Sequence, residues 1–190
     1  MPQSSVQLCS SALIKVGAEP IASFEDGTVE ARVAGALYPM VRDALLCAHP
    51  WSFAIEQAAL PLLTSEPIAD YEHAFQLPVN FLRAISAGSG ARGRGLRYRI
   101  VGRQLRADAD SVILTYVFRP SEGDFPAYVD QALVARLAAE FCIPLTENSS
   151  RAEALFRLAD AELRLARLID SQQDTPEGIE DFTLTGARVG

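Results

Sequence analysis

The hydrophobic pattern of this 190-residue chain changes its period twice, and this limits the folds open to it. Apolar residues recur at helical spacing in the first 50 residues, alternate with polar ones from about residue 70 to 118, and return to helical spacing from residue 126. Periods near 3.6 and 2 are typical of amphipathic helices and half-buried strands. The order predicts an α+β protein: an antiparallel bundle of about four helices with an inserted small antiparallel β-sheet lobe and an extended C-terminal tail.

Two helices are predicted before the sheet. The first runs from Ser5 to Val16, and Gly17 follows it as a natural stop. The second runs from Thr28, which can cap a helix N-terminus, to Ala48. It ends there because the residue before a proline, here at position 50, is steered out of the helical region.

Two helices are predicted after the sheet. One begins at Pro126, a favourable first-turn residue, and ends at Pro144. The last begins at Ser150, because Ser150 and Glu153 have the spacing of a capping box, and continues to about residue 170. Its apolar face is predicted from Leu155, Leu158, Leu165 and Leu168. Its exposed face is predicted from two charge pairs four residues apart, Glu153 with Arg157 and Asp160 with Arg164.

Alternating residues over about 70–118 predict one small antiparallel sheet, with a hairpin turn at residues 101–104. The predicted organisation therefore has N-terminal bundle helices at 1–57, an inserted β lobe at 58–119, C-terminal bundle helices at 120–172 and an acidic tail at 173–190. Trp51 and Phe53, directly after the second helix, are predicted to anchor the bundle to the sheet.

Composition is that of an ordinary globular chain, with 49% hydrophobic and 22% charged residues. No apolar run approaches the roughly 20 residues that span a bilayer, and the first residues lack the pattern of a secretory signal. Three cysteines, Cys9, Cys47 and Cys142, lie far apart, which disfavours a disulfide framework. We therefore expect synthesis in a reducing cytoplasm.

Charge is distributed unevenly along the chain. The formal net charge is −7, yet residues 73–107 contain seven arginines and no acidic residue. An acidic protein with one basic lobe is expected to meet its partners through patches of opposite sign. Arginine supplies all but one of the basic side chains, and this favours planar, bidentate contacts.

A glycine-rich segment, GSGARGRG at residues 88–95, lies inside the basic stretch. Its first six residues match the dinucleotide pattern G-x-G-x-x-G, but that pattern requires a helix to follow, whereas residues 96–100 alternate like a strand. The hypothesis favoured here is a loop that contacts a protein partner, through Arg92, Arg94, Arg97 and Arg99. Direct contact with nucleic-acid phosphates and an idle solvated loop remain the alternatives.

The tail combines acidic residues with Ile179, Phe182 and Leu184. Such a segment is typical of a hook that orders on a partner, and the alternative is a frayed terminus. His49 and His73 are the only histidines, neither has neighbours at metal-ligand spacing, and no G-x-S-x-G elbow is present. The sequence therefore predicts no catalytic residue, metal or cofactor. A small hydrolase that uses one of the histidines stays a remote alternative.

Several segments together resemble a known family. They are VGAEPIASF at residues 16–24, Tyr38 with RDALL at 42–46, HPWSFA at 49–54, and Tyr71 with FQLP at 75–78. This pattern resembles the tail tubular protein A family, the head-to-tail adaptors of short-tailed bacteriophages and their prophage relatives. The likeness covers roughly residues 5–172 and is strongest in the first half.

The resemblance implies a virion structural protein at the head–tail junction. It implies a ring of twelve copies that binds the portal protein on one side and a downstream tail protein on the other, with DNA passing through the channel without sequence-specific binding. The resemblance carries over no catalytic residues. Two alternatives come from the residues themselves: a nucleic-acid-binding module built on the arginine-rich lobe, and the small hydrolase.

Overall fold

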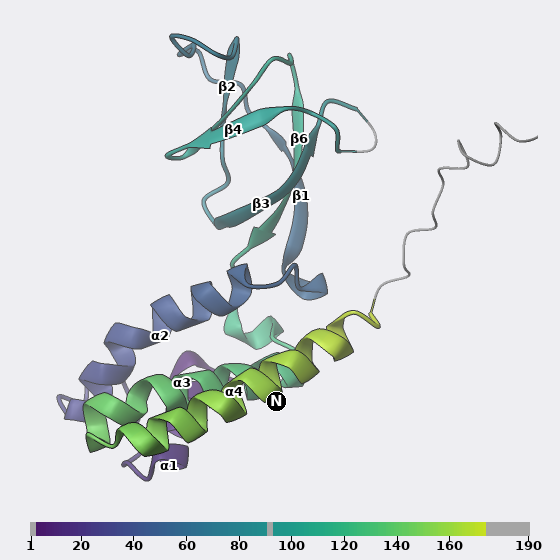
Figure 1. The fold of residues 1–190 in the computed structure, drawn as a ribbon. Coiled ribbons are helices and arrows are strands. Elements are labelled where there is room, and N and C mark those ends of the chain that lie inside the picture. The colour runs from purple at the N-terminus through teal and green to yellow at the C-terminus, as the bar shows by residue number, and fades with distance from the viewer. Residues whose placement is uncertain (1–2, 91–92, 174–190) are drawn as a thin grey trace, which may run out of the picture.

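The computed structural model describes residues 3–90 and 93–173, which form a helical bundle and a separate β lobe stacked on one end of it (Figure 1). The bundle contains α1 (Ser5–Val16), α2 (Val29–Cys47), α3 (Ala127–Thr146) and α4 (Ser149–Asp170). The lobe is inserted between α2 and α3, so the α+β prediction is confirmed. Within the described ranges, no helix is both long and apolar enough to cross a membrane.

The β lobe contains two sheets, where the sequence predicted one. Its strands are β1 (Ile55–Leu60), β2 (His73–Gln76), β3 (Phe81–Gly88), β4 (Tyr98–Val101), β5 (Gln104–Ala107) and β6 (Val112–Phe118). Both sheets are antiparallel and three-stranded, ordered β1-β6-β3 and β2-β5-β4. Two sheets form because residues of both, among them Phe75, Leu105 and Leu114, fill one shared core. β1 begins at Ile55, inside the segment that the sequence assigned to the bundle.

Most of the predicted helix ends and turns are confirmed. Gly17 ends α1 with φ 80°, a left-handed conformation that glycine adopts without strain. The side chain of Thr28 caps α2 by accepting a hydrogen bond from the N–H of Ala31 at 3.1 Å. The predicted hairpin turn joins β4 to β5, and Gly102 there has φ 58°.

Two helix ends differ from their predictions. α3 continues beyond Pro144 to Thr146, whose Oγ1 donates to the carbonyl of Cys142 at 2.6 Å and helps to satisfy the last turn. α4 begins at Ser149, and its cap is the side chain of Asn148, which accepts from the N–H of Arg151 at 2.9 Å. The predicted capping box of the Ser150 region is wrong because the tight α3–α4 connection already places an asparagine at the capping position.

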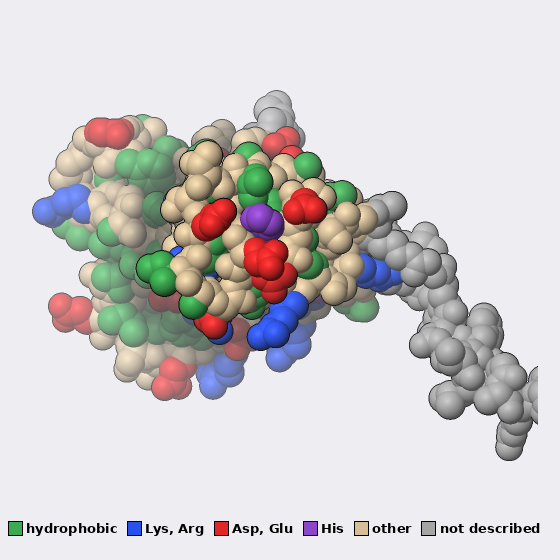
Figure 2. Space-filling view, turned by 90° about the horizontal axis from the view of Figure 1, so that it is seen from above, with side chains coloured by type: hydrophobic (Ala, Val, Ile, Leu, Met, Phe, Trp, Pro, Cys, Tyr) green, Lys and Arg blue, Asp and Glu red, His purple; other side chains and the backbone are tan. Residues whose placement is uncertain are grey.

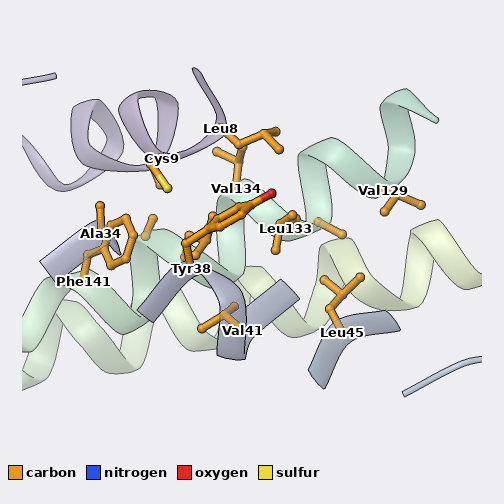
Figure 3. Packing of buried hydrophobic residues seen from close by; sticks show 14 of the residues in the cluster. Leu8, Cys9, Ala34, Tyr38, Val41, Leu45, Val129, Leu133, Val134 and Phe141 are labelled. Carbon is orange, nitrogen blue, oxygen red and sulfur yellow. The ribbon is translucent and has the colours of Figure 1, made fainter. Parts of the chain in front are cut away.

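One apolar core holds the bundle together (Figure 3). Leu8 from α1, Tyr38 from α2 and Leu133 from α3 meet there, and all are 3% exposed or less. Trp51 is fully buried in the same cluster, and its indole N–H donates to the carbonyl of Leu45 at 3.0 Å. Phe53 is partly buried and packs edge-on to Phe125, with ring centroids 5.7 Å apart. Trp51 and Phe53 both pack in the bundle core, which also includes Val117 of β6; their role as an anchor of the sheet stays a prediction.

The face that α4 buries differs from the predicted one at three of its four leucines, and Leu155 alone of the four packs, partly buried, against the bundle core. Ala152, Ala159 and Ala166, each seven residues from the next, are buried, whereas Leu158, Leu165 and Leu168 are 44–57% exposed. α3 presents a run of buried alanines toward the interior, at positions 132, 135, 138 and 139. Small side chains on both helices favour close helix packing, so the alanine face of α4 is the one that is buried. The predicted exposed face is confirmed, because Glu153, Arg157, Asp160 and Arg164 are all exposed, although they form no ion pairs among the described residues.

Candidate interaction surfaces

The arginines predicted to bind a partner lie on the β lobe, at and after the glycine-rich loop. Arg94, Arg97 and Arg99 are exposed. The Arg99 guanidinium pairs with Asp70 at 3.2 Å, and that of Arg97 lies over the ring of Tyr71 at 6.0 Å. Both contacts hold the segment that precedes β2. These two arginines therefore have structural contacts inside the lobe, in addition to any partner that they bind.

The other four predicted partner-binding residues are Arg92, Ile179, Phe182 and Leu184, and they lie outside the described residues. The structure thus leaves the proposed tail hook and one arginine of the loop as predictions.

The β lobe is less basic in space than the sequence stretch suggested. Residues 55–119 contain eight arginines but also six acidic residues, most of them in the segments that flank the arginine run. Figure 2 shows acidic side chains around a histidine on the end of the lobe that faces away from the bundle. In β2, His73 has its Nε2 3.6 Å from a carboxylate oxygen of Asp110, and Asp108 accepts from the N–H of Glu72 at 2.9 Å.

A buried carboxylate joins the end of α4 to the chain that leaves α2. Asp170 is the one fully buried charged residue of the described chain, at 3% exposed. It accepts hydrogen bonds from the backbone N–H of Ser52 at 3.1 Å, from the Ser52 hydroxyl at 2.8 Å and from the Tyr128 hydroxyl at 2.9 Å. Burial and the hydrogen bond to Asp170 raise the pKa of Tyr128 to about 12, so its hydroxyl stays a donor at neutral pH. These bonds fix the point where the chain enters the lobe.

A second polar network fixes the point where the chain returns from the lobe. Glu122 accepts from the hydroxyl of Tyr38 and from the guanidinium of Arg42, both at 2.9 Å. Arg119, just after β6, forms a bidentate pair with Asp43 of α2, with the Nε contact at 3.0 Å. Burial alone would raise the pKa of Glu122. The hydrogen bonds with its own backbone, Tyr38 and Arg42 outweigh burial, so the net pKa of Glu122 lies below its ordinary value. Both chain segments that connect the lobe to the bundle are thus held by charged groups.

The serine, histidine and carboxylate at the junction do not form the relay of a hydrolase. His49 Nε2 lies 3.4 Å from Asp170, and the Ser52 hydroxyl donates to the same carboxylate. In a catalytic triad the histidine stands between nucleophile and acid and takes the proton of the nucleophile. Burial lowers the pKa of His49, although Asp170 opposes the shift. Among the described residues, no group of three or more potential ligands is placed to hold a metal ion.

The outer side of α4 carries an exposed apolar stripe, which we call the α4 seam. It consists of Ala154, Leu158, Ala161, Leu165 and Leu168, all exposed. The spacing of four, three, four and three residues places these side chains in one line along the helix. Exposed helix faces are normally polar, so this stripe is a candidate contact surface.

A trough between α2 and its neighbours, which we call the α2 groove, is the second apolar surface. One hollow of about 380 Å³ and another of about 630 Å³ meet at Glu140, and together they follow α2 over its whole length. Their lining residues are Val29, Arg32, Val33, Ala36, Leu37, Met40, Val41, Ala44, Leu45 and Ala48 from α2, Ala132, Arg136, Glu140, Ile143 and Pro144 from α3, and Ala159, Asp160 and Leu163 from α4. Met40 at its centre is 62% exposed.

Sequence reasoning missed the α4 seam because it assigned the leucines to the core. The recurrence of alanine every seven residues in α4 is the signal that could have revealed a second, narrower face. It also missed the role of Asp170, because one carboxylate at the end of a helix carries no local mark of burial.

The fold places the protein in the α+β class, with a helical bundle that carries an inserted two-sheet lobe. Comparison of the chain with protein-family models and with curated proteins found no match.

Proposed function

We propose that this chain is a head-to-tail adaptor of a short-tailed bacteriophage or prophage, which forms a ring between the portal protein and the next tail component. The observation that carries the proposal concerns the residues on which the family resemblance rests. Tyr38, Arg42 and Asp43 belong to one junction network, and His49 and Ser52 belong to the other. The resemblance thus falls on the groups that hold the β lobe in a fixed position on the bundle.

A fixed connection between two bodies suits an adaptor, because such a protein must transmit one partner's position to the other. Its contacts are those of a structural protein: apolar surfaces on the bundle and charged ones on the lobe. As a ring member it would form in the host cytoplasm and act in the virion, at the head–tail junction. The channel wall is proposed to be neutral or acidic, so that DNA slides past it.

Electron microscopy of the protein mixed with the portal protein and the tail protein encoded beside it tests this proposal. We expect rings on the portal, and a free protein that is monomeric or weakly associated. Deletion of residues 173–190, with its tail hook around Phe182, is expected to abolish portal attachment while the bundle still unfolds cooperatively. A protein that stays apart from both partners, or that forms a stable dodecamer alone at micromolar concentration, contradicts the respective part of the proposal.

The nucleic-acid-binding alternative makes the opposite prediction on DNA. It requires tight binding to duplex DNA that weakens steeply with salt. The six acidic residues that share the lobe with the arginines, and the contacts that occupy Arg97 and Arg99, favour protein partners instead. Measurement of DNA affinity at two salt concentrations separates the two functions.

A further inference from the structure

We propose that residues 179–185 of the tail add to the open edge of β1 in their own chain, as a fourth strand of the sheet β1-β6-β3. Such docking occurs in the free protein and does not depend on the adaptor role. Three observations carry it: the unpaired edge of β1, the place where α4 ends, and the residue pattern of the tail.

The outer edge of β1 has no partner within the described part of the chain. β1 pairs with β6 along its other edge over all six residues, from Ile55 to Leu60, without a bulge. No hydrogen bond joins the outer backbone groups of β1 to residues 3–90 or 93–173. Five of the six residues are not buried, and the strand contains no proline. A strand edge of this kind accepts another strand unless something covers it.

The other edge strands are less suited to receive the tail. The outer side of β2 is bonded to the segment at 61–63, where the N–H of Leu63 donates to the carbonyl of Ala74 at 2.8 Å. Beside β3, the N–H of Leu96 donates to the carbonyl of Ala87 at 2.9 Å. β4 lies at the edge of the second sheet. β1 is the edge strand that begins directly at the junction with the bundle.

α4 ends beside the start of β1. The carboxylate of Asp170, the last residue of α4, accepts from the backbone N–H of Ser52 at 3.1 Å. From Ser52 a single 3₁₀ turn, which rises roughly 2 Å per residue, leads to Ile55 at the start of β1. The five residues 174–178 can span roughly 17 Å when extended. Residue 179 can therefore reach the edge of β1 in its own chain, and Figure 1 shows β1 above the end of the bundle at which α4 ends.

The tail has the pattern of a linker followed by a strand. The linker, DTPEG at residues 174–178, contains a proline and a glycine, which favour a turn. In IEDFTLT at residues 179–185, Phe182 and Leu184 alternate with threonines, and glycines flank the segment on both sides, as is typical of a strand. With Phe182 and Leu184 on the same side as Leu60, the added strand extends the apolar core of the lobe.

The short linker favours docking within one chain over exchange with a second copy. It holds the tail at an effective concentration in the millimolar range near its own β1, roughly a thousandfold above a micromolar solution of other copies. If the tail also binds the portal, as proposed above, the portal and β1 compete for it, so portal binding must first release the tail from β1.

Hydrogen exchange of the β1 amides, followed by mass spectrometry, tests the docking. The full chain is compared with a variant that lacks residues 179–190 and keeps the linker. We expect the outer amides of β1 to exchange at least tenfold more slowly in the full chain, because they bond to the added strand. The double substitution Phe182→Glu and Leu184→Glu should speed their exchange as much as the deletion does. Arg188→Gln, outside the proposed strand, is the matched control and should leave it unchanged.

Cross-linking identifies the chain to which the docked tail belongs. Thr183→Cys and Ala59→Cys are combined in a Cys47→Ser background, in which Cys9 and Cys142 stay buried. With a short bismaleimide we expect mainly linked monomers, several-fold more than in a control that carries Val79→Cys in place of Ala59→Cys. Val79 is 93% exposed and precedes β3, the opposite edge strand of the sheet.

Two outcomes overturn the docking. The first is equal exchange of the β1 amides in the full chain and in the deletion variant, which shows that the tail leaves the edge uncovered. The second is a product of linked dimers in place of linked monomers, which shows that the tail pairs with a second copy. Far-ultraviolet circular dichroism of each variant checks that it is folded.

The docking and the adaptor role can fail separately. Slow exchange at β1 in a protein that does not bind portal upholds the docking and rejects the adaptor role. Portal binding by a protein whose β1 amides exchange equally fast with and without residues 179–190 upholds the adaptor role and rejects the docking.

Discussion

The bundle and the β lobe of this protein present opposite kinds of surface. The bundle is acidic, with eight basic and fourteen acidic residues in 1–54 and 120–173, yet its two open surfaces are apolar. The lobe contains eight arginines against six acidic residues and exposes most of these charges. The two bodies thus differ in the kind of surface that they expose: apolar faces on the bundle and charged side chains on the lobe.

The two bodies also differ in how they are held together. The bundle has one core that draws on all four helices, whereas the lobe has a smaller core between two three-stranded sheets. Trp51, Asp170 and Glu122 lie where the two bodies join. Substitutions at the junction should therefore affect the whole molecule, and those on one surface should affect only that surface.

The largest effect is expected from Trp51→Ala. Removal of this fully buried side chain leaves a cavity where the chain passes from bundle to lobe, and it should lower the free energy of unfolding by about 3–5 kcal/mol. Urea unfolding, followed by circular dichroism, measures the loss. Ile68→Ala, at a fully exposed position of the lobe, is the control and should change stability by under about 0.5 kcal/mol. A loss below about 1 kcal/mol at Trp51 would show that the two bodies are stable without their joint.

The second largest effect is expected from Asp170→Ala, which should lower the free energy of unfolding by about 3 kcal/mol. The substitution leaves buried donors of Ser52 and Tyr128 without their acceptor, and such groups are costly to bury. The matched control is Asp160→Ala on the exposed side of the same helix, which should cost little. Equal losses for the two variants would mean that the junction carboxylate does not join the bodies.

Asp130→Asn tests the bundle alone and is expected to stabilise it. Burial raises the pKa of Asp130 to about 6, and its Oδ1 is buried without a hydrogen-bond partner in the described chain. The carboxyl of Asp130 therefore binds its proton more tightly in the folded protein than in the unfolded chain. This proton binding contributes stability that is fully present below about pH 4 and is lost as the pH rises through about 6. The gain from Asp130→Asn should be about 1 kcal/mol at pH 8, allowing for partial exposure.

Thermal unfolding of both proteins at about pH 3 and at pH 8 measures this effect. The difference between them should become small at about pH 3, where the carboxyl is largely protonated in the folded and unfolded states alike. A difference that does not depend on pH would assign the effect to packing, and a destabilised variant at pH 8 would contradict the sign.

The smallest effect is expected for Arg99→Gln on the lobe. Its ion pair with Asp70 is exposed on both sides, and such pairs contribute at most about 1 kcal/mol. The variant should keep its melting temperature within a few degrees in low salt, and the difference should shrink further in high salt. If docking uses the lobe's charges, the same substitution slows association with the tail protein. Arg157→Gln, on the bundle, is the control for a general effect of charge.

Local pattern in the sequence determined the secondary structure to a large extent. The order of helices and strands, the stop at Gly17, the cap at Thr28 and the turn at Gly102 all follow from residue types within a few positions of one another. β1 escaped prediction because five of its six residues are not buried and therefore leave no clear alternation.

Tertiary structure decided which of two possible faces was buried and which charges became neighbours. The leucine face of α4 is the more hydrophobic one, but the alanine-rich surface of α3 accepts the narrow face of Ala152, Ala159 and Ala166. In the same way, acidic residues outside the arginine run came to lie beside it on the lobe, and Asp170 met donors 118 positions away along the chain. Periodicity acts over a few residues, whereas burial depends on the shape and polarity of whatever the fold brings alongside.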